Sequence, residues 1–183
     1  MNTYGSYFNV NRETWNKKTA VHAASDFYAM QDFINGKTSL NKFELDALGD
    51  VSGKKMLHLQ CHFGQDTLSW SRLGARCTGV DIADEAIALA RKYTEQLQLD
   101  ARFVCCKMLD TPDHLNGQFN IVYTSYGVLS WLPDFEPWGE IVSKMLRPGR
   151  TFYIVEFHPI AWMFDYLEEP PKMKYGYNQE EMI

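Results

Sequence analysis

The chain has 183 residues, of which 45% are hydrophobic and 22% charged, proportions typical of one soluble globular domain with a sizeable core. Lys and Arg number 18 against 23 Asp and Glu, so the formal net charge is −5, which argues against a broad electrostatic contact with nucleic acid or an anionic membrane. No apolar run approaches the ~20 residues that span a bilayer, and we expect no signal peptide. The four cysteines lack zinc-ligand spacing, so we expect no metal site, reduced thiols and a cytoplasmic location.

The first fifty residues are predicted to form an N-terminal helical cap. Apolar spacing predicts a long helix over 12–34 that ends at Asn35-Gly36. A second, short helix is expected around 41–48, and Gly49 and Gly53 then lead the chain into its first strand.

The segment 54–81 is the most informative part of the sequence. It reads as a buried strand over 56–59, a turn over 60–64, a helix over 67–73 and a second strand over 77–80 that ends at Asp81. A strand, a turn and a helix N-terminus in this order leave free backbone N–H groups facing a crevice, as in nucleotide pockets. A carboxylate after the second strand can accept both hydrogens of a ribose diol, so the segment predicts a nucleotide site with Asp81 on the ribose.

Helices continue to alternate with strands along the rest of the chain. We expect, in chain order, a helix over 85–97, a strand over 101–105, a loop over 111–117, a strand over 119–124, a helix over 135–146 and a strand over 151–157. This alternation predicts an α/β doubly wound, mainly parallel sheet with helices on both faces. Residues 51–160 would form this nucleotide-binding domain and 161–183 an irregular tail, within a single domain overall.

Four segments at the expected spacing carry a family resemblance: MLHLQCHFGQDT (56–67), GVDIADEAIALAR (79–91), FNIVYTSYGVLSWLPD (119–134) and LRPGRTFYIVEFHP (146–159). Over roughly 40–160 the chain resembles class I S-adenosylmethionine-dependent methyltransferases of the bacterial small-molecule type. The resemblance implies a Rossmann-like fold, S-adenosylmethionine as cofactor, S-adenosylhomocysteine as product and a small-molecule methyl acceptor.

The resemblance also implies site residues. Those expected to contact the cofactor are Gln60, His62, Gly64, Asp81, Ile82, Met108 and Ser125. Gly64 would approach the methionine part of the cofactor or adopt a backbone conformation closed to other residues. Tyr126, His158 or His62 could serve as a general base, with packing or loop roles as the alternatives for Tyr126 and His158, and the sequence selects no catalytic residue.

The chain departs from the family at its first motif. An acidic residue usually ends the strand where this sequence has His58, and Gln60 and His62 stand where the family has glycines. A side chain at either position would crowd the approach of the backbone to the cofactor. We interpret the motif as a subfamily form that still binds the cofactor.

The family sheet has seven strands in the order 3-2-1-4-5-7-6, but only five are predicted here, so we interpret the chain as lacking strands 6 and 7. The strand over 151–157 would then be an open apolar edge, which favours a homodimer, or cover by the segment 161–177. A non-catalytic or incomplete methyltransferase-fold module that acts through a partner chain is the alternative function. A nicotinamide dehydrogenase is a third, although the G-x-G-x-x-G turn it needs is missing.

Overall fold

The computed structural model describes residues 4–165 and 169–177. Its centre is one five-stranded parallel sheet in the order β3-β2-β1-β4-β5. The strands are β1 (Lys55–Leu59), β2 (Arg76–Asp81), β3 (Ala101–Cys105), β4 (Phe119–Ser125) and β5 (Leu146–Val155). The α/β fold, the parallel sheet and the five strands predicted from the sequence are therefore confirmed.

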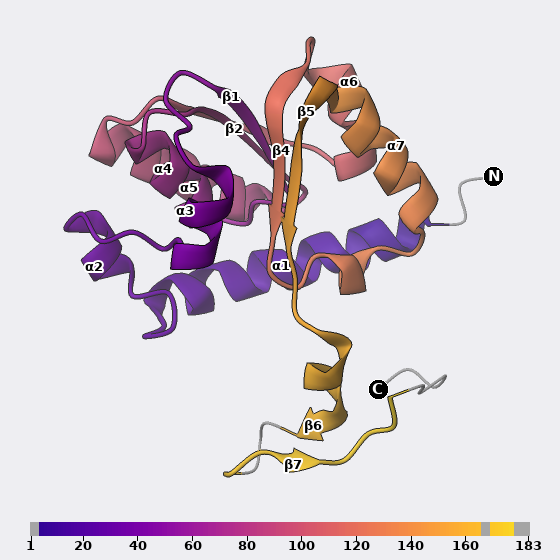
Figure 1. The fold of residues 1–183 in the computed structure, drawn as a ribbon. Coiled ribbons are helices and arrows are strands. Elements are labelled where there is room, and N and C mark those ends of the chain that lie inside the picture. Colours follow the sequence, from indigo (N-terminus) through magenta and orange to yellow (C-terminus); the bar gives the residue numbers. More distant parts are fainter. Residues whose placement is uncertain (1–3, 166–168, 178–183) are drawn as a thin grey trace.

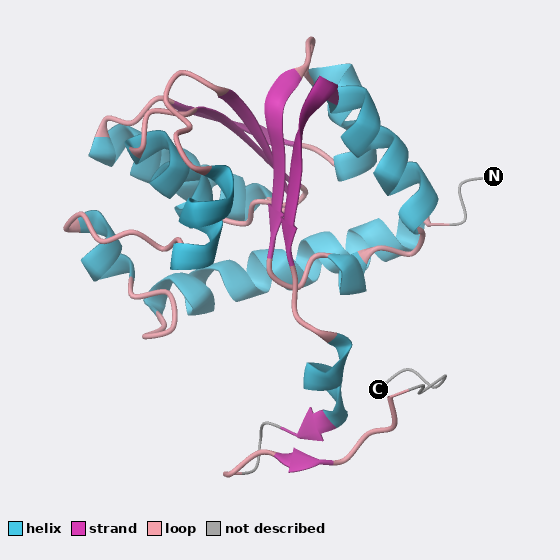
Figure 2. Cartoon of the chain, in the orientation of Figure 1, coloured by secondary structure: helices cyan, strands magenta, loops and turns pink. Residues whose placement is uncertain are grey.

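Helices cover both faces of the sheet (Figure 1 and Figure 2). They are α1 (Gly5–Ala24), α2 (Met30–Ile34), α3 (Lys42–Leu48), α4 (Gln65–Arg72), α5 (Asp84–Leu97), α6 (Thr111–His114) and α7 (Phe135–Met145). The helices α4 and α5 pack against β2 and β3, while α7 packs against β4 and β5. Helix α1 runs past the carboxyl ends of the strands (Figure 1), which is the edge where ligands bind in open parallel sheets.

The central strand β1 forms the middle of the hydrophobic core. Met56, Leu57 and Leu59 of β1 have no exposed surface, because β1 lies between β2 and β4 and carries helices on both faces. Trp70 of α4 and Tyr123 of β4 are equally buried. The apolar run that predicted a strand buried on both faces thus forms the middle of the molecule.

Two predictions about local structure were wrong. The helix expected over 12–34 is two helices, because the N–H and hydroxyl of Ser25 both donate to the carbonyl of His22 and end α1, and Ala29 then adopts a left-handed conformation. The loop expected over 111–117 begins with the short helix α6, where Pro112 occupies the first turn, a position at which proline loses no hydrogen bond.

The segment after β5 leaves the sheet (Figure 1). It forms a 3₁₀ turn over Pro159–Met163 and a short antiparallel pair of β6 (Phe164–Asp165) with β7 (Lys172–Met173). Within the described ranges, β6 and β7 pair with each other and not with the main sheet, so the outer edge of β5 has no strand beside it. The part of 161–177 that is described therefore does not cover this edge.

Candidate functional site

The turn between β1 and α4 has three residues in the left-handed region. Gln60 has φ = 58°, His62 has φ = 51° and Gly64 has φ = 75°. Two of these residues carry side chains, although such values favour glycine. The turn therefore adopts a backbone conformation typical of glycine-rich turns, although only one of these three residues is a glycine.

Gly64 is required by packing as well as by its φ angle. A Cβ atom at this position would lie 2.5 Å from Cε1 and Cζ of Phe103 and 3.3 Å from Cβ of Ala90. Contact with a cofactor at Gly64 stays a prediction, because this close approach already accounts for the glycine.

Asp81 ends β2 beside this turn. Its Oδ2 accepts the N–H of His62 at 2.7 Å and its Oδ1 accepts the N–H of Ala83 at 2.9 Å. Burial raises the pKa of Asp81, against the lowering effect of these backbone N–H groups. Each carboxylate oxygen keeps acceptor capacity, so Asp81 fits a ribose diol, and Ile82 follows it in the same loop.

The side chain of Gln60 points away from Asp81 and connects two elements of the other wall. Its Oε1 accepts the indole N–H of Trp138 in α7 at 3.1 Å, and its Nε2 donates to the carbonyl of Val128 at 3.3 Å. Gln60 therefore holds the loop after β4 against α7.

The ring of His62 points toward the N-terminal cap. Its Nε2 lies 3.2 Å from Nδ1 of His22, and its ring packs edge-on against Trp15 with centroids 5.0 Å apart. Burial, together with His22 and Lys18, lowers the pKa of His62 to about 3, so the imidazole is neutral. Its Nδ1 is buried without a hydrogen-bond partner in the described part of the chain.

One face of α1 packs over the turn and the loop after β4. Asn11 donates from Nδ2 to the carbonyl of Trp131 at 3.1 Å, and Trp15 packs edge-on against the Trp131 ring at 5.2 Å. The ammonium of Lys18 lies 5.1 Å from the Trp131 centroid and 5.2 Å from that of Trp15, within cation–π range. Helix α1 therefore forms a wall over the turn and Asp81.

A second polar cluster lies where β1 and β4 end. The carboxylate of Asp66, in the first turn of α4, accepts hydroxyl hydrogens from Ser39 at 2.6 Å and Ser125 at 3.0 Å. The hydroxyl of Ser125 also lies 3.2 Å from Nε2 of His58, whose Nδ1 is 2.8 Å from the hydroxyl of Thr67. Burial, with a smaller contribution from Glu44, raises the pKa of Asp66 to about 6 against the lowering effect of the two serine hydroxyls.

Glu44 of α3 is fully buried behind this cluster. Its carboxylate accepts the phenol hydrogens of Tyr123 and, at 2.8 Å, Tyr126. It also accepts the backbone N–H of Asn41 at 2.9 Å, completing a capping box at the start of α3. Burial and Glu44 together raise the pKa of Tyr126.

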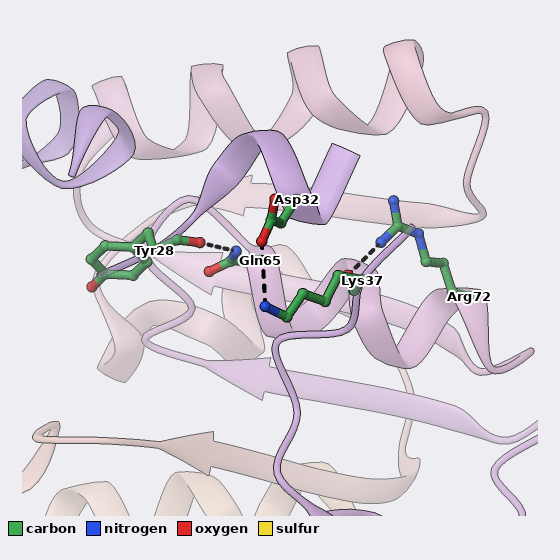
Figure 3. A network of polar contacts seen from close by, with 5 residues as sticks. All are labelled: Tyr28, Asp32, Lys37, Gln65 and Arg72. Carbon is green, nitrogen blue, oxygen red and sulfur yellow. Dashed lines mark hydrogen bonds and ion pairs between the residues drawn. The ribbon is translucent and has the colours of Figure 1, made fainter. Parts of the chain in front are cut away.

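Figure 3 shows how the cap is attached to α4. Gln65 donates from Nε2 to the carbonyl of Tyr28 at 2.7 Å, and Arg72 donates to the carbonyl of Lys37 at 3.2 Å. Lys37 in turn pairs with Asp32 at 3.3 Å. The segment between α1 and α3 is thus anchored at both ends of α4, which fixes Ser39 beside Asp66.

The structure brings most of the predicted cofactor residues to one edge of the sheet. Gln60, His62, Gly64 and Asp81 are close together, but Met108 lies in a 3₁₀ turn with its side chain in the core. Ser125 is joined to Asp66 and not to Asp81. The assignment of these residues to the cofactor stays a prediction.

The predicted base candidates are separated. Tyr126 lies beside Glu44, whereas His158 is exposed on the turn after β5 and accepts the N–H of Ile160 at 3.2 Å. All four cysteines are free thiols. Among the described residues, no three acidic, histidine or cysteine side chains are arranged to hold a metal ion. No helix in the described ranges is long and apolar enough to cross a membrane.

This geometry agrees with a match to a known family. A family model described as a methyltransferase domain matches residues 56–149, just over half of the chain. The chain belongs to this methyltransferase domain family. The match covers the turn, Asp81 and β4, so the interpretation as a class I S-adenosylmethionine-dependent methyltransferase is confirmed and the dehydrogenase interpretation is set aside.

Curated relatives of the chain agree with this family. An uncharacterized methyltransferase of Synechocystis sp. is 29% identical over 133 residues, which are 72% of this chain and 60% of the relative. A ubiquinone biosynthesis O-methyltransferase of Erwinia tasmaniensis is 27% identical over 149 residues, 79% of this chain and 60% of the relative. The chain thus spans about three fifths of the length of these curated relatives.

Solved structures show the shared fold. The complex of DhpI with SAH superposes with a TM-score of 0.63 at 22% identity, over 82% of this chain and 69% of that chain. A geranyl diphosphate C-methyltransferase from Streptomyces coelicolor superposes with a TM-score of 0.56 at 19% identity, over 63% of this chain and 43% of that chain.

Sequence reasoning about this chain missed the buried polar clusters around Glu44 and Asp66. Both partners of Asp66 lie far along the chain, at Ser39 and Ser125. The phenols on Glu44 come from Tyr123 in β4 and from Tyr126 just after it. The available signal was a carboxylate on the buried face of a short helix, since such a group is rarely buried without polar partners.

Proposed function

We propose that the chain binds S-adenosylmethionine at the carboxyl ends of β1 and β2 and transfers its methyl group to a small-molecule acceptor. The observation that carries the proposal is the carboxylate of Asp81, held by the N–H groups of His62 and Ala83 beside a left-handed turn. The ribose would be held by Asp81, and the rest of the cofactor would contact residues drawn from Gln60, His62, Gly64, Ile82, Met108 and Ser125.

The chemistry asked of the chain is limited. The bound cofactor supplies an activated sulfonium methyl, so the protein has mainly to orient the acceptor and exclude water. Helix α1 would serve the second task, because its Trp15 packs against His62 of the turn and against Trp131. Relatives named as ubiquinone biosynthesis O-methyltransferases support a small organic acceptor.

Binding is tested first. Calorimetry should detect S-adenosylmethionine and S-adenosylhomocysteine but not NAD. Asp81→Ala should weaken binding by ~1.5–3 kcal/mol, the range for hydrogen bonds to a charged group. Asp100→Ala is the matched control, because Asp100 is exposed just before β3 and so lies at the amino ends of the strands, whereas Asp81 lies at their carboxyl ends. Equal affinity in the Asp81 variant and the parent would defeat the ribose assignment.

Transfer is tested second. Formation of S-adenosylhomocysteine is followed over a panel of phenols, alcohols, carboxylic acids, amines and thiols. Turnover with one class supports the enzyme. Tight cofactor binding without turnover on any class would instead favour a non-catalytic module that acts through a partner chain.

The setting and assembly are part of the same proposal. The four free thiols suit a reducing compartment, so we place the protein in the cytoplasm. The uncovered edge of β5 suits a homodimer. Neither nucleic acid nor a membrane surface is needed for the reaction.

A further inference from the structure

The polar cluster around Asp66 lies at the switch point of the sheet. In the order β3-β2-β1-β4-β5, connections run outward in opposite directions from β1 and β4, and ligands bind beyond the carboxyl ends of such a strand pair. His58 lies near the end of β1 and Ser125 ends β4. Asp66 accepts a hydrogen bond from the hydroxyl of Ser125, and the same hydroxyl is hydrogen-bonded to His58.

The donors in this cluster can be ordered. An ionised carboxylate only accepts hydrogen bonds, so Ser125 must donate to Asp66. The Ser125 oxygen is then left to accept from Nε2 of His58, which places the imidazole hydrogen on Nε2. His58 Nδ1 must accordingly accept the hydroxyl hydrogen of Thr67, so every hydrogen bond points toward Asp66.

The charges around Asp66 are few. The titratable groups near it are His58, through Ser125, and in direct range Glu44, Tyr28, Tyr123 and Tyr126. Within the described residues no lysine or arginine forms an ion pair with it. Desolvation therefore dominates and raises the pKa of Asp66 to about 6, close to the value that suits a general base at neutral pH.

Other candidates for this role are already engaged. The phenol of Tyr126 donates to Glu44 and its pKa is raised, so it is a poor base. His58 is buried with both ring nitrogens hydrogen-bonded, and burial lowers its pKa to about 3. Asp66 is half-buried and accepts two side-chain hydrogen bonds from the described residues, whereas a carboxylate can accept about four.

We propose that Asp66 takes the proton from the methyl acceptor, which is therefore a hydroxyl or N–H compound that is still protonated at neutral pH. The inference rests on the proposed function and deepens it. The acceptor oxygen or nitrogen forms a bond to the methyl carbon as the sulfur–carbon bond breaks, and its hydrogen passes to Asp66 as a proton. The positive charge of the sulfonium and the negative charge of the carboxylate disappear together, so the charges balance.

Asp66→Asn tests the inference in the chain as it exists. With a hydroxyl or N–H acceptor that the parent methylates, kcat should fall 10²- to 10⁴-fold, the usual contribution of a general base. Affinity for S-adenosylmethionine should stay within about twofold, since the role is on the acceptor. The matched control is Asp46→Asn, because Asp46 is exposed on α3 and pairs with Lys42 on the same helix. It should retain the parent kcat.

The pH profile supplies a readout that a structural role would not move. In the parent, kcat should rise with pH to a plateau with its midpoint near the raised pKa of Asp66, at about 6. Ser125→Ala removes a hydrogen bond to the ionised form, so its midpoint should lie higher. An Asp66→Asn variant with kcat within fivefold of the parent, or with cofactor affinity lost as strongly as kcat, would overturn the inference.

The titration of Asp66 needs no acceptor. Carbon-13 NMR of labelled aspartate in the complex with S-adenosylhomocysteine should show a carboxyl with a midpoint near 6 that is missing in Asp66→Asn. A midpoint below about 4.5, the ordinary range for aspartate, would overturn the inference. A parent chain that binds cofactor but forms no S-adenosylhomocysteine with any acceptor contradicts the proposed function instead, before any variant is compared.

Discussion

Gly64→Ala should destabilise the fold chiefly through one contact. The added Cβ would lie 2.5 Å from Cε1 and Cζ of Phe103, whereas ordinary contacts between such carbons are ~3.5–4 Å, so the buried ring must move by about 1 Å. Overpacking of this kind costs ~1–3 kcal/mol, and a left-handed φ costs a residue with a side chain ~1–2 kcal/mol more. We expect the free energy of unfolding to fall by ~2–5 kcal/mol, measured by urea denaturation.

Gly53→Ala separates the two costs. Gly53 has φ = 70°, close to the 75° of Gly64, and an added Cβ there meets nothing within 4 Å. This control should therefore show only the backbone cost. Phe103→Leu removes the two ring atoms that clash, so in the double variant the steric cost should largely disappear, with a coupling of ~1–3 kcal/mol. If Gly64→Ala costs no more than Gly53→Ala, the packing argument is wrong.

Three further predictions follow from buried and uncovered groups. The pKa of His62 is lowered to about 3, so below pH 6.5 the unfolded chain binds a proton that the folded chain does not, and stability is lost as the pH falls. Asparagine tolerates a left-handed φ. The His62→Asn variant should therefore reduce the dependence of stability on pH by up to ~1.4 kcal/mol per pH unit, measured by urea denaturation at a series of pH values. Glu44→Gln should lower the free energy of unfolding by ~1–3 kcal/mol, because the buried phenols lose their charged acceptor, and unchanged stability would count against that network. Light scattering at micromolar concentration should show a dimer that Ile154→Lys, on the exposed part of β5, converts to monomer; a monomeric parent whose β5 amides exchange rapidly would refute the edge argument.

The sheet could be predicted because its central strands, β1 and β4, are largely buried. An apolar run such as 56–59 has few other stable environments, and regular alternation with helices leaves little choice of topology. The break between α1 and α2 could not be predicted, because it depends on Ser25 ending one helix and Ala29 adopting a left-handed conformation, and neither choice is dictated by local spacing.

The candidate site could be predicted only where its residues belong to consecutive elements of the chain. Asp81 could be located from the order of strand, turn, helix and strand. Asp66 lies just before the helix predicted over 67–73 and has no local signal of its role, since its partners Ser39 and Ser125 are 27 and 59 residues away. Glu44 has a local role as well, because it closes the capping box with Asn41, and that local role alone would explain its presence.

The two departures from the glycine motif acquire a physical reason in the fold. Left-handed φ costs Gln60 and His62 roughly 1–2 kcal/mol each. Gln60 offsets this with two hydrogen bonds, to Trp138 and the loop after β4, each contributing ~0.5–1.5 kcal/mol. His62 offsets it by packing its ring against α1. Glycines at these positions could adopt the same backbone conformation without strain but would make no side-chain contacts. The side chain of Gln60 instead contacts α7 and the loop after β4, and that of His62 contacts α1. The turn is therefore in contact with α1 through His62 and with α7 through Gln60.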